Sequence, residues 1–217
     1  MLTPLWLTLK VAILATLLAG AARIALGWWM AHRRFAGQSL VDALLMLPMV
    51  LPPTVLGYYL IVLIGRNGVL GRHLQAWFGI NLMFTWQGAV IAASIVALPL
   101  VYKGARAAFE EVDGRFAQAA RTLGAGEFEI FVRIALPLAV RGIASGLMLA
   151  FARAMGEFGA TLMIAGNLPG RTQTLSIAVY DAVQAGDDAQ ALWLTAVISA
   201  VCATVLVISG RLLRARH

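Results

Sequence analysis

Five apolar segments, each about as long as a lipid bilayer is thick, dominate the sequence. They run from Thr8 to Met30, Ala43 to Ile64, Leu82 to Tyr102, Gly142 to Ala165 and Ala191 to Gly210. A helix of about 20 apolar residues crosses the hydrocarbon layer of a membrane. We therefore predict an all-α, polytopic integral membrane bundle of about five transmembrane helices, forming one domain over residues 1–217.

Composition and charge agree with this class of protein. Hydrophobic residues make up 61% of the chain and charged residues only 12%, with a mean hydropathy of +0.84. The formal net charge of +7 is large, but the basic residues cluster at the ends of the apolar segments. That placement favours membrane topology over nucleic-acid binding. The single Cys202 excludes a disulfide within the chain and a cysteine-based metal site.

The first apolar segment differs from the others because it carries Lys10 and Arg23. Lys10 can reach a membrane surface, whereas Arg23 must either reach the interface or face protein. The segment also resembles a secretory signal, with an Ala-rich stretch from Leu18 to Ala22. Its apolar pattern continues to a basic stop, so we expect it to be retained. Removal would leave four spans.

Basic residues are distributed unevenly between the two sets of connections. The poorer set holds only Arg66, Arg72 and Arg171. The richer set holds Arg33, Arg34, Lys103, Arg106, Arg115, Arg121, Arg133, Arg141, Arg211, Arg214 and Arg216. Positively charged connections remain in the cytoplasm. We therefore predict an outside N-terminus, a cytoplasmic C-terminus and external connections at residues 65–81 and 166–190.

The long cytoplasmic connection over residues 103–141 is too short for a catalytic domain. Asp113 can cap a helix that ends at Gly124, a residue suited to a left-handed stop. A second helical stretch from Glu127 to Ala135 leads to Pro137, where the next span begins. The sequence predicts a helix, a turn and a helix that project from the membrane.

This connection carries a spaced motif: Gln118-Ala119-Ala120, three residues, Gly124, nine residues, Ile134, one residue, and Leu136-Pro137. The motif resembles the signature of the permease subunits of bacterial ABC importers, although those most often have Glu at the position of Gln118. The resemblance implies that the loop docks into a separate ATPase. The small alanines would let the helix enter a groove on that partner. Alternatively, the alanines reflect helix propensity in an ordinary loop.

The fourth apolar segment contains two ionisable groups, which are costly in a bilayer. Arg153 and Glu157 are four residues apart and can pair on one helix face. A structural ion pair and the lining of a translocation pathway both explain them. This segment and residues 165–174 resemble the molybdate branch of the importer permeases. Since a carboxylate repels a dianion, we expect a gate or hinge here, formed by Arg153, Gly156, Glu157, Phe158, Gly159 and Thr161.

The second apolar segment contains Pro48, Pro52 and Pro53, followed by Thr54. Prolines remove amide donors and break helices, which a membrane tolerates only beside protein or an aqueous path. A packing kink is the alternative explanation. The resemblance implies that Pro52, Pro53 and Thr54 line the central path.

We identify no catalytic or metal-binding constellation in the sequence. The two lysines, Lys10 and Lys103, follow no phosphate-binding glycine loop, so ATP and Mg must be bound by a partner subunit and no cofactor by this chain. His32, His73 and His217 are scattered.

The resemblance therefore implies a non-enzymatic, multi-pass permease in a bacterial inner membrane, surrounded by lipid, that imports molybdate or tungstate by alternating access. Its implied partners are a second copy of this chain, two ABC ATPases and an extracytoplasmic oxyanion-binding protein. Two alternatives are open. One is a sulfate or thiosulfate permease of the same family, and the other is a secondary carrier or channel, which should show internal repeats or ion-coupling carboxylates.

Overall fold

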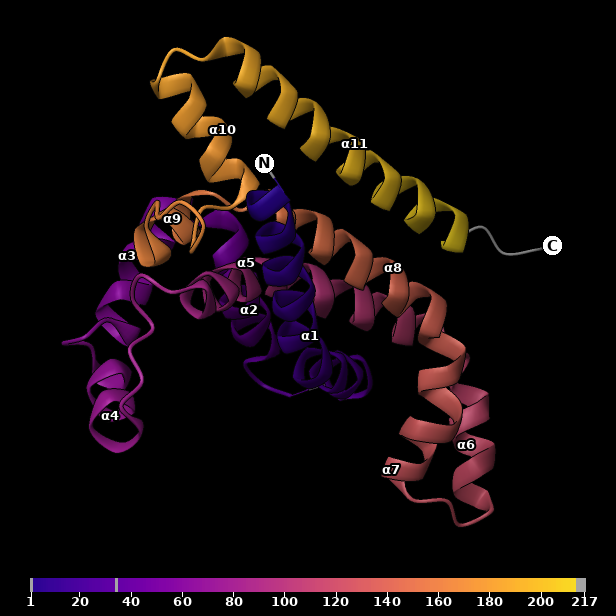
Figure 1. The fold of residues 1–217 in the computed structure, drawn as a ribbon. Helices are drawn as coiled ribbons and strands as arrows, with labels where there is room; N and C mark the ends of the chain where they lie inside the picture. Colours follow the sequence, from indigo (N-terminus) through magenta and orange to yellow (C-terminus); the bar gives the residue numbers. More distant parts are fainter. Residues whose placement is uncertain (1, 34, 214–217) are drawn as a thin grey trace.

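The computed structural model describes residues 2–33 and 35–213, and these form helices joined by short connections, without any strand (Figure 1). The elements are α1 (Leu2–His32), α2 (Gln38–Val50), α3 (Pro53–Ile64), α4 (Val69–Phe78), α5 (Trp86–Glu110), α6 (Gly114–Thr122), α7 (Glu127–Ile130), a π-helical turn (Phe131–Ala135), α8 (Leu136–Met155), α9 (Gly159–Ala165), α10 (Leu175–Gln184) and α11 (Asp188–Leu213). The predicted all-α class is confirmed.

Within the part of the chain that the structure describes, four helices are long and apolar enough to cross a membrane: those beginning at Thr3, Trp86, Glu127 and Asp188. The second predicted span is a pair of helices, α2 and α3, bent by 110° at the break before Pro53. Counting this pair as one span gives the predicted five. Only part of the proline prediction holds, because Pro48 lies inside α2 and the break falls at Leu51 and Pro52.

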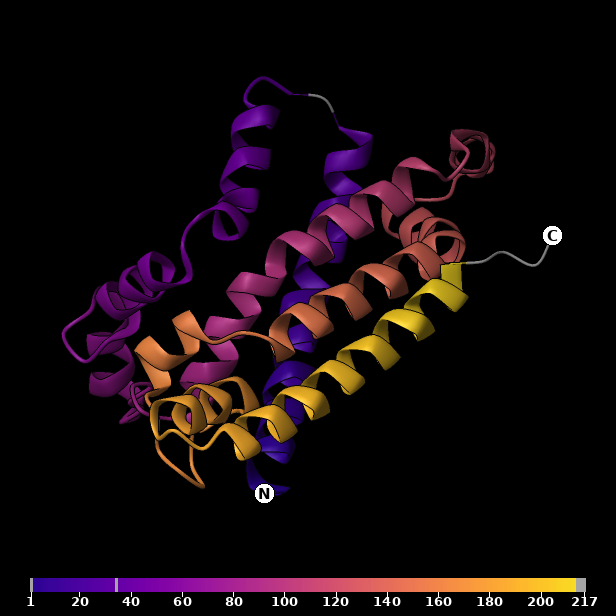
Figure 2. The same cartoon turned by 90° about the horizontal axis from the view of Figure 1, so that it is seen from above.

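The core lies where α1, α5 and α8 meet, and it is built from small side chains. Buried alanines such as Ala12, Ala93 and Ala150 fill the interface. A Cβ on Gly104 of α5 would lie 2.8 Å from the Cα of Gly146 of α8, so these backbones touch. Figure 2 shows α5, α8 and α11 lying side by side with their axes roughly aligned, with α8 antiparallel to the other two. Close backbone approach through small residues is how helices associate in lipid.

Three predicted boundaries differ from the structure. The third span begins at Trp86 rather than Leu82, because the Thr85 hydroxyl accepts the Gly88 N–H at 3.2 Å and caps the helix there. The same helix continues to Glu110, well beyond the predicted end. The fourth span is split, since α8 ends at Met155 and α9 begins at Gly159. The two connections predicted to be external also contain helices, α4 and α10, that the sequence did not predict.

The first apolar segment forms one helix that supplies part of the core. Val11, Ala12 and Ala15 are buried against α5. Arg23 donates to the Leu18 carbonyl at 2.8 Å, which places its guanidinium along its own helix.

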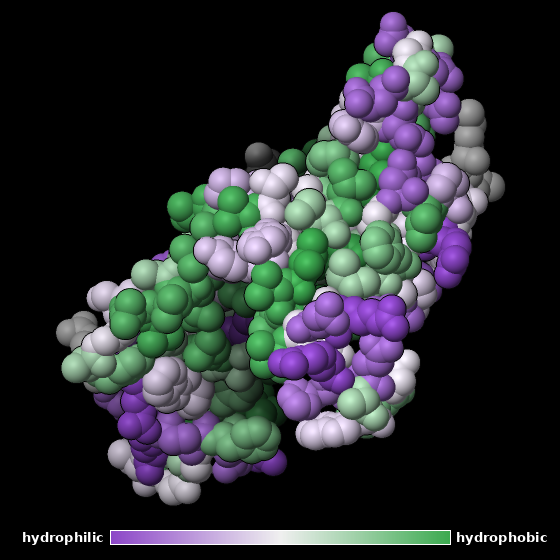
Figure 3. Space-filling view, turned by 90° about the vertical axis from the view of Figure 1, so that its left-hand side faces the viewer, coloured by the Kyte–Doolittle hydropathy of each residue, from purple (hydrophilic) through white to green (hydrophobic). Residues whose placement is uncertain are grey.

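The bundle has two distinct ends. In Figure 2, α4 and α10 lie at one end with the start of α1, and α6 lies at the other with the end of α11. Figure 3 shows a broad hydrophobic region across the middle of one face, with hydrophilic residues gathered toward its upper and lower ends. Of the residues used to predict orientation, Arg34, Arg214 and Arg216 lie outside the described residues, as does His217.

Candidate functional site

The two helix breaks predicted as parts of a pathway meet in space. Pro53 begins α3 and Gly159 begins α9, and a Cβ on Gly159 would lie 2.7 Å from the Cβ of Pro53. One turn on, a Cβ on Gly57 would lie 2.8 Å from the Cβ of Met163. Real side chains do not approach so closely, so both positions require glycine. The predicted residues of the second and fourth apolar segments therefore form one site, which we call the break site: residues 51–54 and 156–161.

Glu157 holds the break site together through both of its carboxylate oxygens. Its Oε2 lies 2.9 Å from Nη1 of Arg153, and its Oε1 accepts the Ala160 N–H at 2.9 Å. The second contact satisfies one of the free amides at the start of α9, which helps explain why the helix restarts there. The predicted ion pair is thus present. Glu157 is only 2% exposed, whereas the side chain of Arg153 is 40% exposed.

Other residues of the break site differ in their exposure. Pro52, Pro53, Thr54 and Gly156 are exposed, so the Thr54 hydroxyl is open on the surface of the single subunit. Thr161 is 1% exposed and faces protein in this conformation. Phe158 packs against Tyr180 of α10, with ring centroids 5.1 Å apart. The break site therefore connects α3, α9 and α10.

The predicted docking loop has the expected helix, turn and helix. The Asp113 carboxylate accepts the Arg115 N–H at 2.9 Å and caps α6. The neighbouring Arg115 guanidinium lowers the pKa of the Asp113 carboxyl, so the cap is ionised at neutral pH. Gly124 has φ +84° and ends α6, and the Ala125 N–H then reaches back to the Ala120 carbonyl at 3.0 Å.

The two helices of the loop are tied together and present apolar side chains to solvent. Arg121 contacts both carboxylate oxygens of Glu127, at 2.7 and 3.1 Å, across the turn. Phe116, Leu123 and Phe128 are 55%, 88% and 80% exposed. Of the motif residues, Gln118 and Ala119 are exposed and Ala120 is buried. Figure 1 shows α6 and α7 projecting together from the end of the bundle.

The remaining motif residues join this loop to the membrane bundle. Ile134 lies in the π-helical turn, Leu136 begins α8, and Pro137 follows in its first turn. Proline has no N–H to donate and its ring clashes with the carbonyl four residues earlier. The wider π turn accommodates it, because the Leu136 N–H bonds five residues back to Phe131. The helix therefore runs unbroken from Glu127 to Met155.

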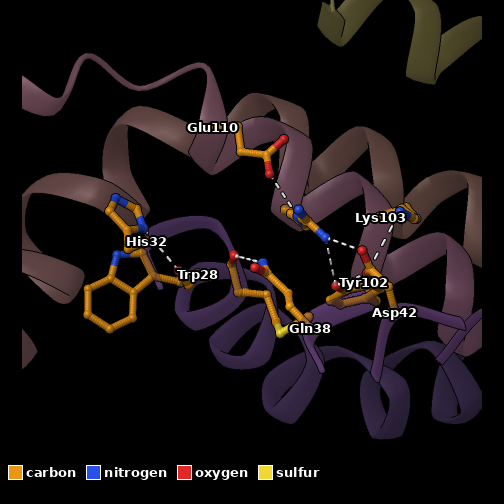
Figure 4. Close-up of polar contacts among 9 residues, drawn as sticks. Trp28, His32, Gln38, Asp42, Tyr102, Lys103 and Glu110 are labelled. Atoms are coloured by element: carbon orange, nitrogen blue, oxygen red, sulfur yellow. Dashed lines mark hydrogen bonds and ion pairs between the residues drawn. The ribbon is translucent and has the colours of Figure 1, made fainter. Parts of the chain in front are cut away.

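A second polar cluster, which the sequence did not predict, ties α2 to α5 (Figure 4). Asp42 of α2 accepts hydrogen bonds from the Tyr102 hydroxyl and the Arg106 guanidinium, and the Lys103 ammonium lies 3.8 Å away. Arg106 also bonds Glu110 at 2.7 Å. We call these five residues the Asp42 cluster. Its only sequence signal was an acidic residue at the edge of an apolar segment, because its partners are about 60 residues distant.

Within the described residues, no three His, Cys, Asp or Glu side chains gather as a metal site would require. The chemistry that the break site, the docking loop and the Asp42 cluster can perform is noncovalent: holding helices together and releasing them.

Comparison with known proteins gives one consistent result. The family model described as "Binding-protein-dependent transport system inner membrane component" matches residues 23–217. The chain is 44% identical over 209 residues to the molybdenum transport system permease protein ModB of Escherichia coli (strain K12), covering 96% of this chain and 91% of that protein.

Two other matches are more distant. The sulfate transport system permease protein CysT of Salmonella typhimurium is 34% identical, with 92% of this chain and 72% of that protein covered. A chain of the inward-facing methionine ABC transporter MetNI superposes with a TM-score of 0.74 at 15% identity, covering 99% of this chain and 96% of that chain. At such low identity, the superposition shows a shared fold.

Proposed function

Because the chain belongs to the family of binding-protein-dependent transport system inner membrane components, we propose that it is the permease subunit of an ABC importer that carries molybdate into the cytoplasm. The observation that supports molybdate as the substrate is the 44% identity to a molybdenum permease over nearly the full length of both chains. Tungstate, which has the same charge and shape, is a second expected cargo. A sulfate or thiosulfate permease is the rival, and its support is the weaker 34% identity.

The proposed assembly contains two copies of this chain, two ABC ATPases and an external oxyanion-binding protein. A second copy is supported by α2, in which no residue is buried within the single subunit. Leu44, Leu47 and Val50 are 60%, 44% and 78% exposed there. The exposed Thr54 at the adjoining break would then face the two-fold axis. Native mass spectrometry of the purified transporter should give two permease and two ATPase copies, and a complex with one permease would contradict this assembly.

In the proposed mechanism, this chain supplies two packed states and no bond chemistry. The ATPases bind ATP and Mg, and their closure pushes on the docking loop, whose contact residues are Gln118, Ala119, Ala120, Gly124, Ile134, Leu136 and Pro137. The push passes along the helix from Glu127 to Met155 and reaches the break site. There, Pro52, Pro53, Thr54, Gly156, Glu157, Phe158, Gly159 and Thr161, together with Arg153 in the last turn of α8, open or close the pathway.

The anion meets few strong ligands along this route. Thr54 is an exposed hydroxyl, whereas Arg153 is already paired with Glu157. Weak contacts suit transport, since a tight site would slow release. We therefore assign affinity to the external binding protein and assign movement to this subunit.

Uptake into right-side-out vesicles tests the function. Vesicles holding this chain, its ATPase and its binding protein should accumulate molybdate only with ATP inside, and unlabelled tungstate should compete. If sulfate competes better than tungstate, the assigned cargo would be sulfate and not molybdate. Uptake that continues without the ATPase would instead favour a secondary carrier.

A further inference from the structure

A pocket of about 520 Å³ opens at the end of the bundle that holds α4 and α10. Its walls come from the first turns of α1, the start of α5 and the connection after α9, and they include Lys10, Trp86, Gln87 and Arg171. None of these residues belongs to the break site or the docking loop. The proposed function therefore does not account for this pocket.

The pocket is positively charged and contains no carboxylate among its lining residues. Neither Lys10 nor Arg171 has an ion pair among the described residues. Asp181, which lines an adjacent pocket, is bonded to Asn167 and Gln173 at 3.0 Å. Two cations in one pocket repel each other unless an anion or water lies between them.

Lys10 is held in place by an aromatic ring. Its ammonium lies 3.5 Å from the centroid of the Trp86 ring, and it sits about 12 Å along α1 from the start of the helix at Leu2. The ring face stabilises and orients the positive charge of the ammonium. The ring carries no negative charge, so it does not neutralise the ammonium as a carboxylate would. The ammonium has three N–H donors and retains the capacity to bind an oxyanion.

The other donors limit what the pocket can bind. Thr85 and Thr172 already use their hydroxyls, since Thr85 donates to Leu82 at 2.8 Å and Thr172 donates to Gly166 at 3.2 Å. The side-chain donors that remain include the Lys10 ammonium, the five N–H groups of Arg171, the side-chain amide of Gln87, the Thr3 hydroxyl and the indole N–H groups of Trp6 and Trp86. An arginine fork, a lysine and an amide that line one pocket match a tetrahedral oxyanion with several acceptor oxygens.

From this geometry we propose that the pocket is a binding site for a phosphate-type oxyanion, held by Lys10 and Arg171. The same chemistry has two sources. One is the phosphate of an anionic phospholipid headgroup, which would lie beside Trp6 and Trp86 as aromatic residues do at a membrane surface. The other is a free tetrahedral oxyanion in the external medium.

The test uses the whole chain in complex with its ATPase, and the variants Lys10→Gln and Arg171→Gln. Arg72→Gln is the matched control, because it removes one exposed cation from α4 and lies outside the pocket. In the lipid experiment, the complex is extracted from vesicles of equal parts phosphatidylglycerol and phosphatidylcholine, and retained lipid is identified by native mass spectrometry. In the free-anion experiment, inorganic phosphate and molybdate are titrated calorimetrically into delipidated complex.

Retention of phosphatidylglycerol by the wild type, with about tenfold or greater loss in each pocket variant and none in Arg72→Gln, would establish a headgroup site. Binding of phosphate or molybdate with the same pattern of losses would establish a free-oxyanion site. Absence of both, or equal losses in the control, would overturn the proposal. Because neither experiment measures uptake, this proposal can fail while the permease assignment stands.

Discussion

At the scale of single residues, Glu157 combines two tasks that a purely structural ion pair would not need. It pairs with Arg153 and also accepts the Ala160 N–H at the start of α9. Glutamine can perform the second task but not the first, and alanine can perform neither. The two substitutions therefore separate the charge from the helix cap.

We expect Glu157→Gln to destabilise the protein less than Glu157→Ala does. The alanine variant loses the helix cap as well as the ion pair, which leaves the buried Ala160 N–H without an acceptor. This loss should lower the free energy of unfolding by about 1–2 kcal/mol more than the loss of the ion pair alone. The thermal midpoint of the purified complex should fall in the order wild type, Gln, Ala. Molybdate uptake at equal expression is the second readout. Equal midpoints for the two variants would show that the cap contributes nothing.

Gly159 is the residue whose size most directly controls the break site. A Cβ there would lie 2.7 Å from the Cβ of Pro53, so Gly159→Ala must push α9 away from α3. We expect uptake to be lost and stability to fall by about 1–3 kcal/mol, as overpacking does elsewhere. Gly210→Ala is the control, because a Cβ at Gly210 meets nothing within 4 Å. Equal effects of the two changes would contradict the close packing.

At the scale of helices, the Asp42 cluster fixes α2, which has no buried residue of its own. Asp42→Asn keeps an acceptor for Tyr102 but removes the charge opposite Arg106 and Lys103. We expect uptake to fall while ATPase binding is retained, with a stability loss of about 1–2 kcal/mol, since these groups are partly exposed. Glu110→Gln, which removes the other carboxylate on Arg106, should leave uptake much less affected. Uptake and ATPase binding falling together in Asp42→Asn would contradict this role.

The turn after α6 depends on one glycine. Gly124 has φ +84°, where an alanine costs about 1–2 kcal/mol, so Gly124→Ala should distort the docking loop and reduce copurification of the ATPase. Gly114→Ala is its control on the same helix, because a Cβ there meets nothing within 4 Å and alanine favours helix. If the ATPase copurifies with the Gly124→Ala variant as well as with the wild type, the turn does not contribute to docking.

Features set by neighbouring residues were predictable from the sequence, and features set by distant contacts were not. The Asp113 cap, the left-handed Gly124 and the Arg153–Glu157 pair each depend on residues a few positions apart. The 110° bend depends on how α3 packs on α9, more than 90 residues later in the chain, and the Asp42 cluster depends on α5. A single sequence contains no local pattern for such pairs. The split at Met155 was hidden because both halves of the fourth segment are apolar.

At the scale of the whole molecule, the distribution of basic residues predicts an outside N-terminus. With Cys202 replaced by serine, a single cysteine at Gln75 of α4 should react with a membrane-impermeant maleimide in intact cells. A single cysteine at Ala125 should react only after the membrane is opened. The opposite pattern would invert the predicted orientation, although the same helices would still span the bilayer.

The unbroken helix from Glu127 to Met155 has a mechanical consequence. Its 29 residues make a rod about 44 Å long, in which the π-helical turn before Pro137 keeps the helix continuous. About two thirds of the way along it, Gly146 touches Gly104 of α5, and the helix ends at Met155, one residue before Gly156. If the helix tilts about this contact, we expect movement of the Phe128 end in one direction to move the Met155 end in the opposite direction, and by about half the distance, because Met155 lies about half as far from the contact.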